Sequence, residues 1–241
     1  MASQRESGTF RQTGAPELRK EQGVGNVETL DTKEQLRRLL IPEVSLKPFS
    51  ELSAVTYDHQ GSQLAGHLLL DTLEEAGFGI DDFDAVGALT AAAIPLAISM
   101  VQAAASRGQD LDAFVMDFVY PGIKGPSVRG ERVFLLDAWL SEKSYVQTSS
   151  LVTLRNGNEL SLDFGILQRE GAEVLGIVSL IGAARSTEGI EAVNPLDGSR
   201  HTLPFVRVFD EDEFSAVIPE HESGAGDSAP AAVDSAAEEG Q

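Results

Sequence analysis

The segment Val133–Ser144 reads VFLLDAWLSEKS, and it decides how the rest of the chain is interpreted. An apolar run leads into a single carboxylate, Asp137, and then into Trp139, the only tryptophan of the chain. Near-continuous apolar runs are typical of parallel strands that are covered on both faces. Sheets of this kind bind ligands beyond the carboxyl ends of their strands. We therefore expect Asp137 to mark the edge of a sheet at which a site would lie.

Other segments of the chain alternate between strand-like and helix-like patterns. Strands are predicted at 84–87, 111–119, 131–139 and 172–182. Helices are predicted at 32–41, at 62–77 and from Pro95 to just before Gly108, with Pro42 and Pro48 breaking the chain after the first of them. Strands that alternate with helices predict an α/β fold, here a doubly wound parallel sheet flanked by helices.

One segment departs from this alternation. Residues 149–164 read SSLVTLRNGNELSLDF, with alternating apolar positions around Asn156 and Gly157. An Asn-Gly pair between such runs predicts an inserted β-hairpin, which would be either a tolerated surface insertion or an edge for a protein partner. The alternative is a helix over 159–170, and Gly165 counts against it.

Charge and composition exclude several classes of function. The net charge of the 241 residues is -20, which disfavours binding to a nucleic-acid backbone. No apolar run is long enough to span a membrane. The absence of cysteine removes disulfides and thiolate ligands, and it fits a cytoplasmic protein. The four histidines show no ligand spacing, so no metal site is expected.

The two ends of the chain differ in composition from its middle. Residues 1–30 are rich in small and polar side chains, and we expect a flexible segment. Residues 210–241 hold ten acidic and no basic side chains, which predicts a disordered acidic tail. A single domain over 31–209 is the expected folded part.

Four segments, taken in order and spacing, resemble orotate phosphoribosyltransferase, a family of type I phosphoribosyltransferases. They read FDAVGALTAAAIPLA, LDAFV, GIKGPSVRGERVFLLDA and REGAEVLGIVSLI, and the resemblance covers residues 57–181. It implies a parallel sheet flanked by helices, with a small hood. It also implies magnesium-dependent transfer of a phosphoribosyl group to orotate, a glycosyl transfer in pyrimidine nucleotide metabolism, by a homodimer.

The resemblance places a ribose and phosphate site after the apolar run. In the family, two acidic residues hold the ribose hydroxyls, and a turn of Thr, Ser and Gly cradles the 5′-phosphate through backbone N–H groups. The first acid corresponds to Asp137, the second to Ala138, and the turn to 139–143. The resemblance therefore implies a degenerate site at Asp137, Ala138, Trp139, Ser141 and Lys143, where the carboxylate of Glu142 would also repel a phosphate.

Three further parts of the family's site have counterparts in the chain. The pyrophosphate loop corresponds to Gly87, Ala88, Leu89, Thr90 and Ala91, whose small residues would still let a ligand approach the backbone. Asp117 and Phe118 take the place of a basic pair, and Lys124 is no evident substitute. The orotate-binding Asp-Arg pair corresponds to Gly182 and Ala183, and Arg185 would serve only after a shift of two residues.

These residues leave more than one interpretation open. Asp137 is either a relic ribose-binding acid or an ordinary aspartate at a strand end. Trp139 either lines a new ligand pocket or a protein contact, or fills the emptied cleft. The leading hypothesis is a homologue that has lost phosphoribosyl transfer, has no catalytic residues or cofactor, and acts as a homodimeric binding or regulatory protein. The alternative is an active transferase with an atypical site and magnesium.

Overall fold

The computed structural model describes residues 31–46, 52–141, 154–155, 159–183 and 189–216. The strands are β1 (Ala85–Ala88), β2 (Asp112–Asp117), β3 (Gly122–Lys124), β4 (Arg132–Leu140), β5 (Leu154–Arg155), β6 (Glu159–Ser161), β7 (Glu173–Gly182), β8 (Ile190–Val193), β9 (Arg200–Leu203) and β10 (Phe205–Asp210). Within the described ranges, a six-stranded sheet has the order β10-β7-β4-β1-β2-β3 and a four-stranded sheet has the order β5-β6-β8-β9. In the large sheet β3 runs antiparallel to β2, and the other neighbouring strands are parallel.

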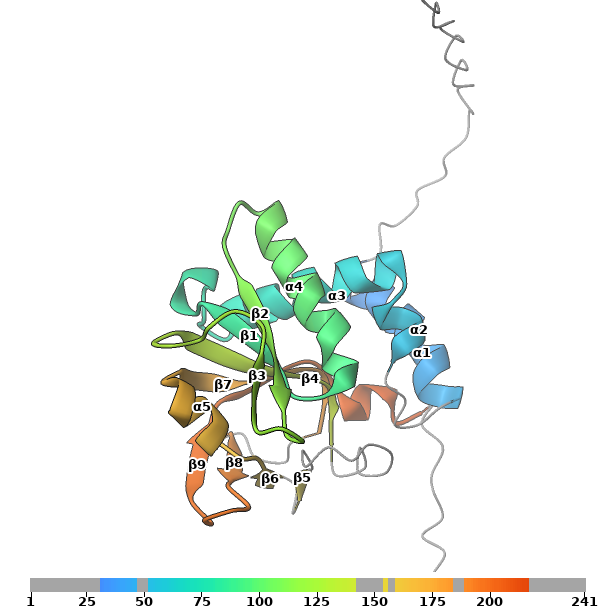
Figure 1. Ribbon diagram of the computed structural model, residues 1–241. Coiled ribbons are helices and arrows are strands. Elements are labelled where there is room, and N and C mark those ends of the chain that lie inside the picture. Colours follow the sequence, from blue (N-terminus) through green and yellow to red (C-terminus); the bar gives the residue numbers. More distant parts are fainter. Residues whose placement is uncertain (1–30, 47–51, 142–153, 156–158, 184–188, 217–241) are drawn as a thin grey trace, which may run out of the picture. The chain divides into compact units, whose positions relative to one another are not determined.

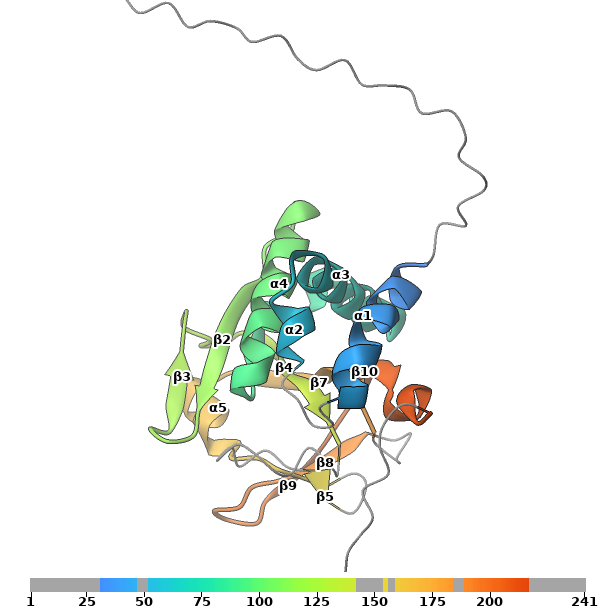
Figure 2. The ribbon, with the colours of Figure 1, turned by 90° about the vertical axis from the view of Figure 1, so that its right-hand side faces the viewer.

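Helices cover one face of the large sheet, and the small sheet lies on the other face (Figures 1 and 2). The helices are α1 (Thr32–Leu46), α2 (Ser53–Thr56), α3 (His59–Glu75), α4 (Ile94–Ser106) and α5 (Gly165–Glu170). Helices α3 and α4 lie above the sheet in both views, and α5 lies below it with the small sheet. The predicted α/β fold is confirmed. The second face, however, is covered mainly by strands, where we expected helices.

Two apolar cores explain why the strands are apolar on both faces. Successive residues of a strand point to opposite faces of its sheet. Phe134 and Leu136 of β4 therefore share one face and join the core under the helices. Val133 and Leu135 join the core under α5 and the small sheet. All four side chains have no exposed surface. The apolar run of β4 is therefore buried from both sides, as predicted.

The predicted helix over 62–77 is observed as α3, and local signals set its ends. The side chain of Asp58 accepts hydrogen bonds from the backbone N–H groups of Gln60 and Gly61, which caps the first turn. Gly77 follows the helix with a φ of 94°, a conformation that glycine adopts without strain. Gly66 faces α4, where a Cβ would lie 2.3 Å from the carbonyl oxygen of Ser99, so α3 and α4 can pack closely.

The first helix corrects our prediction that Pro42 breaks the chain. Helix α1 runs through Pro42 to Leu46. Leu36, Leu40 and Val44 continue one apolar stripe on both sides of the proline, and all three are fully buried. A proline inside a helix costs about 3 kcal/mol, whereas burying each large apolar side chain contributes about 1.5–3 kcal/mol. Tertiary burial therefore outweighs the local penalty.

The predicted hairpin is confirmed by the antiparallel pairing of β5 with β6, in which Arg155 lies opposite Glu159. Asn156 and Gly157 lie outside the described residues. Strand β6 also pairs with β8, and Leu160 and Leu162 are fully buried, so the hairpin is built into the small sheet and its core. The interpretation as a surface insertion is therefore wrong. A helix does follow, but it begins only at Gly165.

The folded part extends beyond the predicted domain end at residue 209. Strand β10 ends at Asp210, and a 3₁₀ turn over Glu211–Phe214 follows it. The ring of Phe214 is 1% exposed and packs against Phe209, with centroids 5.5 Å apart. The acidic residues around it suggested a solvated tail, but one buried aromatic ring anchors the turn in the core.

Candidate functional site

Two segments meet where β1 and β4 approach their carboxyl ends. The strands are parallel, with Ala88 opposite Leu136. The backbone N–H of Leu89 donates to the carbonyl of Leu136 at 2.9 Å. One residue later, the hydroxyl of Thr90 donates to Oδ1 of Asp137 at 2.7 Å. The structure thus brings the turn after β1, which includes Gly87, Ala88, Leu89, Thr90 and Ala91, against the carboxylate singled out from the sequence.

The carboxyl group of Asp137 lies in an apolar environment. Its residue is 5% exposed, and burial raises its pKa from 3.8 to about 6, although the hydrogen bonds from Thr90 and from the backbone N–H of Ala138 act in the opposite direction. The bond from Ala138 measures 2.8 Å. No described lysine or arginine forms an ion pair with Asp137. The group can therefore exchange a proton near neutral pH, but it has little access to solvent.

Strand β4 does not end at Asp137. It continues through Ala138, Trp139 and Leu140, and these pairings extend the ladder with β7 as far as Leu140 opposite Gly182. Ala138, Trp139 and Leu140 are all buried, and so is Ser141 after them. Two of the five residues that the resemblance assigned to a phosphate-binding turn, Trp139 and Leu140, thus belong to the paired strand. Glu142 and Lys143 lie outside the described residues.

Trp139 belongs to the core under the helices and is 4% exposed. Its indole N–H donates to Oε1 of Glu211 at 3.3 Å, so the polar edge of the ring is satisfied inside the protein. The interpretation that Trp139 fills the emptied cleft agrees with this burial, and an open ligand pocket or protein contact around its ring does not. Sequence reasoning missed Glu211 because it assigned that residue to the tail. Asp210 and Glu213, three residues apart, form a capping box that signals local structure there.

Apolar side chains occupy the space on the other side of the turn. A Cβ on Gly87 would lie 2.3 Å from the ring of Phe114, so the ring covers that backbone directly. Leu89 is 1% exposed and joins the core that also contains Leu140 and Leu160 of the small sheet. The turn is therefore packed against protein side chains on the face that the small sheet covers.

The hairpin of β2 and β3 stands where the family has its basic loop. Asp117 Oδ2 lies 2.7 Å from the ammonium of Lys124. The hydrogen bond from Lys124, followed by those from the backbone N–H groups of Tyr120 and Val119, lowers the pKa of Asp117. Lys124 is therefore paired with a carboxylate of its own hairpin. Gly182 ends β7 and Ala183 bonds to Leu140, whereas Arg185 lies outside the described residues.

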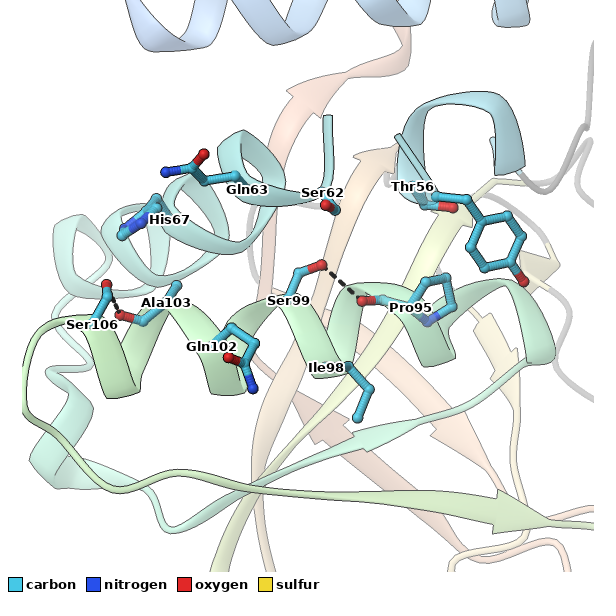
Figure 3. A pocket seen from close by; sticks show the side chains of 11 residues that line it. Thr56, Ser62, Gln63, His67, Pro95, Ile98, Ser99, Gln102, Ala103 and Ser106 are labelled. Atoms are coloured by element: carbon cyan, nitrogen blue, oxygen red, sulfur yellow. Dashed lines mark hydrogen bonds between the residues drawn. The ribbon is translucent and has the colours of Figure 1, made fainter. Parts of the chain in front are cut away.

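Other kinds of site are weakly represented in the described ranges. They contain no cluster of His, Asp and Glu that could hold a metal ion. None of their helices is long and apolar enough to cross a membrane. A groove of about 540 Å³ lies between α3 and α4, and its lining contains neither Asp137 nor any other Asp, Glu, Lys or Arg (Figure 3).

Comparison with known proteins gives a consistent result. No family model matches the chain. Orotate phosphoribosyltransferase from Streptomyces avermitilis is 30% identical over 171 residues, which are 68% of this chain and 80% of that protein. The Streptomyces coelicolor enzyme is 29% identical over the same share of both chains. A phosphoribosyltransferase structure from Corynebacterium diphtheriae has 22% identity and a TM-score of 0.51, and covers 77% of this chain and 99% of that one. The Mycobacterium tuberculosis orotate phosphoribosyltransferase with inorganic phosphate has 21% identity and a TM-score of 0.52, with coverage of 77% and 91%.

Proposed function

The chain belongs to the orotate phosphoribosyltransferase family, and from that membership we propose that it has lost phosphoribosyl transfer and acts as a non-catalytic binding or regulatory protein of nucleotide metabolism. The observation that carries the proposal is the continuation of β4 beyond Asp137. A phosphate cradle needs a turn whose N–H groups point at the ligand. Here two of the five corresponding positions, Trp139 and Leu140, are extended, buried and paired with β7.

Reopening this edge would be costly. A cradle would require Trp139 and Leu140 to leave the core, and each large apolar side chain contributes about 1.5–3 kcal/mol by its burial. Trp139 would also give up its bond to Glu211. Each hydrogen bond to a charged phosphate returns only about 1.5–3 kcal/mol. The paired strand is therefore a stable alternative to the ligand-binding turn.

The remaining parts of the site support the same proposal. Ala138 supplies no second acid for a ribose, and its methyl group is 1% exposed. Lys124 is held by Asp117 in the β2–β3 hairpin. The turn after β1 contains no lysine or arginine. Cations that stabilise a departing pyrophosphate act most strongly as its charge develops, and the described part of the site supplies none that is unpaired.

A second candidate is an active transferase with an atypical site and magnesium. The contact of Thr90 with Asp137 favours it, because a turn of small residues still lies beside an acid at the carboxyl ends of two parallel strands. Such an enzyme would have to bind the ribose through Asp137 alone. The buried position of that carboxyl group makes this the weaker candidate.

The intrinsic fluorescence of Trp139 provides a direct test, because this is the only tryptophan of the chain. Phosphoribosyl pyrophosphate with magnesium should leave the emission unchanged, and calorimetric titration should give no heat of binding. Addition of orotate should yield no orotidine monophosphate. The Streptomyces avermitilis relative, run in parallel, is the positive control for the assay. Micromolar binding with turnover would refute the proposal and establish the second candidate, and binding without turnover would identify a sensor of the metabolite.

The proposal also covers the location of the protein in the cell, its oligomeric state and its partners. It includes a cytoplasmic location and a homodimer, as the resemblance to the family implies. We propose that a protein partner would bind along β5, because it is the outer strand of the small sheet among the strands that the structure describes. Unpaired edges of this kind accept a further strand.

A further inference from the structure

The 3₁₀ turn Glu211–Phe214 follows the outer strand β10 and contacts the end of β4, from which it is far removed in the sequence. Oε1 of Glu211 accepts the hydrogen bond from the indole N–H of Trp139 at 3.3 Å, and both residues are buried. The ring of Phe214 belongs to the same apolar core as Trp139. The turn therefore helps to hold in place the side chain that occupies the carboxyl edge of the sheet.

Helix α1 also contacts this turn, through side chains that water can reach. Nζ of Lys33 lies 3.6 Å from Oε1 of Glu213, and the two side chains are 44% and 36% exposed. Nη2 of Arg37 donates to the backbone carbonyl of Glu213 at 3.2 Å, and its guanidinium lies 5.9 Å from the centre of the Phe214 ring. Exposed ion pairs are weak, and salt screens them. The contacts with α1 therefore break at low cost.

The composition of the turn also favours its release as a unit. Its sequence, EDEF, contains three acidic residues and one apolar ring. Its internal bonds form a capping box, in which the backbone N–H of Asp210 donates to Glu213 and that of Asp212 donates to Asp210. Segments that bury little apolar surface and rely on exposed polar contacts open before the rest of a fold. The turn meets this description, whereas the centre of the sheet does not.

We propose that the turn Glu211–Phe214 is a latch on the carboxyl edge of the sheet. When the latch is closed, Glu211 and Phe214 keep Trp139 in the core, and β4 stays paired with β7 to its end. When it opens, Trp139 loses an acceptor and a neighbouring ring, and the end of β4 separates from β7 while the centre of the sheet stays folded. Ligands of parallel sheets bind at this edge, so the latch controls access to it.

The latch goes beyond the proposed function and does not depend on it, because the edge opens or stays closed whether or not a ligand binds there. Amide hydrogen exchange, followed residue by residue by NMR on the full chain, measures the opening directly. The amides of residues 138–140 that are bonded to β7 report on the end of β4, and those of residues 85–88 report on the centre of the sheet. We expect the first group to exchange faster in the unmodified chain.

Phe214→Ala and Phe83→Ala form a matched pair of variants, because both rings are buried, at 1% and 2% exposure. Phe83 packs against Phe134 of β4, with centroids 5.3 Å apart, in the part of the core that stays folded when the latch opens. Phe214→Ala should accelerate exchange at residues 138–140 about tenfold or more, because it weakens the closed latch. Phe83→Ala should accelerate exchange at residues 85–88 and leave residues 138–140 unchanged, because its loss affects the open and closed latch equally.

A milder pair of variants tests the latch without removing a core side chain. Lys33→Gln removes the ion pair with Glu213 and should accelerate exchange at residues 138–140 about twofold to fivefold. Sodium chloride should do the same to the unmodified chain and add little to Lys33→Gln. Lys124→Gln is the control, because Lys124 pairs with Asp117 in the β2–β3 hairpin, and it should leave these amides unchanged.

Three outcomes would refute the latch. The first is exchange at the end of β4 that Phe83→Ala accelerates as much as exchange in β1, since the edge would then open only when the whole chain unfolds. The second is exchange at the end of β4 that Phe214→Ala leaves unchanged. The third is an equal response to Lys33→Gln and Lys124→Gln, which would mean that the contact with α1 does not hold the turn.

Discussion

The two ends of the β1–β4 strand pair hold carboxylates in opposite surroundings. At the amino end, Asp84 lies beside Arg132, with 3.0 Å between Oδ1 and Nη2, and the hydrogen bond from that guanidinium lowers the pKa of Asp84. At the carboxyl end, burial raises the pKa of Asp137 to about 6, and the donors to it among the described residues are a hydroxyl and a backbone N–H. A charge is easily kept where a cation and water are near. The same charge is unfavourable where the chain has closed over it.

This difference in surroundings reflects the burial of the sheet edge at the carboxyl ends of β1 and β4. Parallel sheets usually leave the carboxyl ends of their strands open to a ligand. Here Trp139 and Leu140 extend the strand, and the small sheet adds Leu160 to the same core as Leu140. The part of this edge that the structure describes around Asp137 is buried. Substitutions at four positions test this comparison.

The largest effect is expected for Ala138→Asp, which restores the second acid that the family pattern has at this position. Ala138 is 1% exposed in the core under the helices. An unpaired carboxylate in such a place costs several kcal/mol, a large part of the 5–15 kcal/mol by which domains are stable. We expect the variant to be largely unfolded at neutral pH by circular dichroism. Ala91→Asp, in the exposed part of the turn after β1, is the control and should fold. A well-folded Ala138→Asp protein would mean that this end of the strand is open to water.

A smaller loss is expected for Trp139→Ala. Removing a buried tryptophan costs about 3–5 kcal/mol, because the transfer free energy is lost and a cavity remains. Urea unfolding should show this decrease in the free energy of unfolding. Trp139→Phe keeps most of the ring and should cost less, chiefly through the lost bond to Glu211. If the alanine variant were as stable as the unmodified chain, the indole could not be the side chain that fills the former cleft.

The smallest effects are expected for Asp137→Asn and Asp84→Asn, which should change the free energy of unfolding in opposite directions at high pH. Between pH 3.8 and about 6, the folded chain holds a proton on Asp137 that the unfolded chain has released. The contribution of this group to the free energy of unfolding therefore falls as the pH rises through that range, by about 3 kcal/mol in all. Asp137→Asn removes this loss, because the amide oxygen still accepts from Thr90, and the variant should be the more stable protein at pH 8.

Asp84→Asn should act in the opposite direction. The pKa of Asp84 is lowered in the folded chain, so its ionised form contributes stability above pH 3.8, and that stability is lost as the pH falls through the folded pKa. The variant should therefore be less stable than the unmodified chain at neutral pH. Urea unfolding at pH 4 and pH 8 distinguishes the two. Equal effects of both substitutions at pH 8 would contradict the contrast between the strand ends.

Much of the fold follows from local patterns that the sequence displays openly. The apolar run before Asp137 predicted β4, and Pro95 and Gly108 set the limits of α4. The pattern around Asn156 and Gly157 predicted the pairing of β5 with β6. These signals are legible because strand alternation, helix periodicity and turn chemistry act over a few residues.

Other features depended on contacts between distant residues. Only the tertiary structure shows that Trp139 and Leu140 are enclosed in the core, because the ladder with β7 and the bond to Glu211, 72 residues away from Trp139, stabilise a segment that the resemblance assigned to a phosphate-binding turn. Burial of Leu40 and Val44 likewise carries α1 through Pro42. The sequence by itself determined the family, the strands and the identity of the lone acid. The packing of the small sheet and of Trp139 decided that this acid is enclosed, because burial is a property of the assembled core and cannot be read from neighbouring residues.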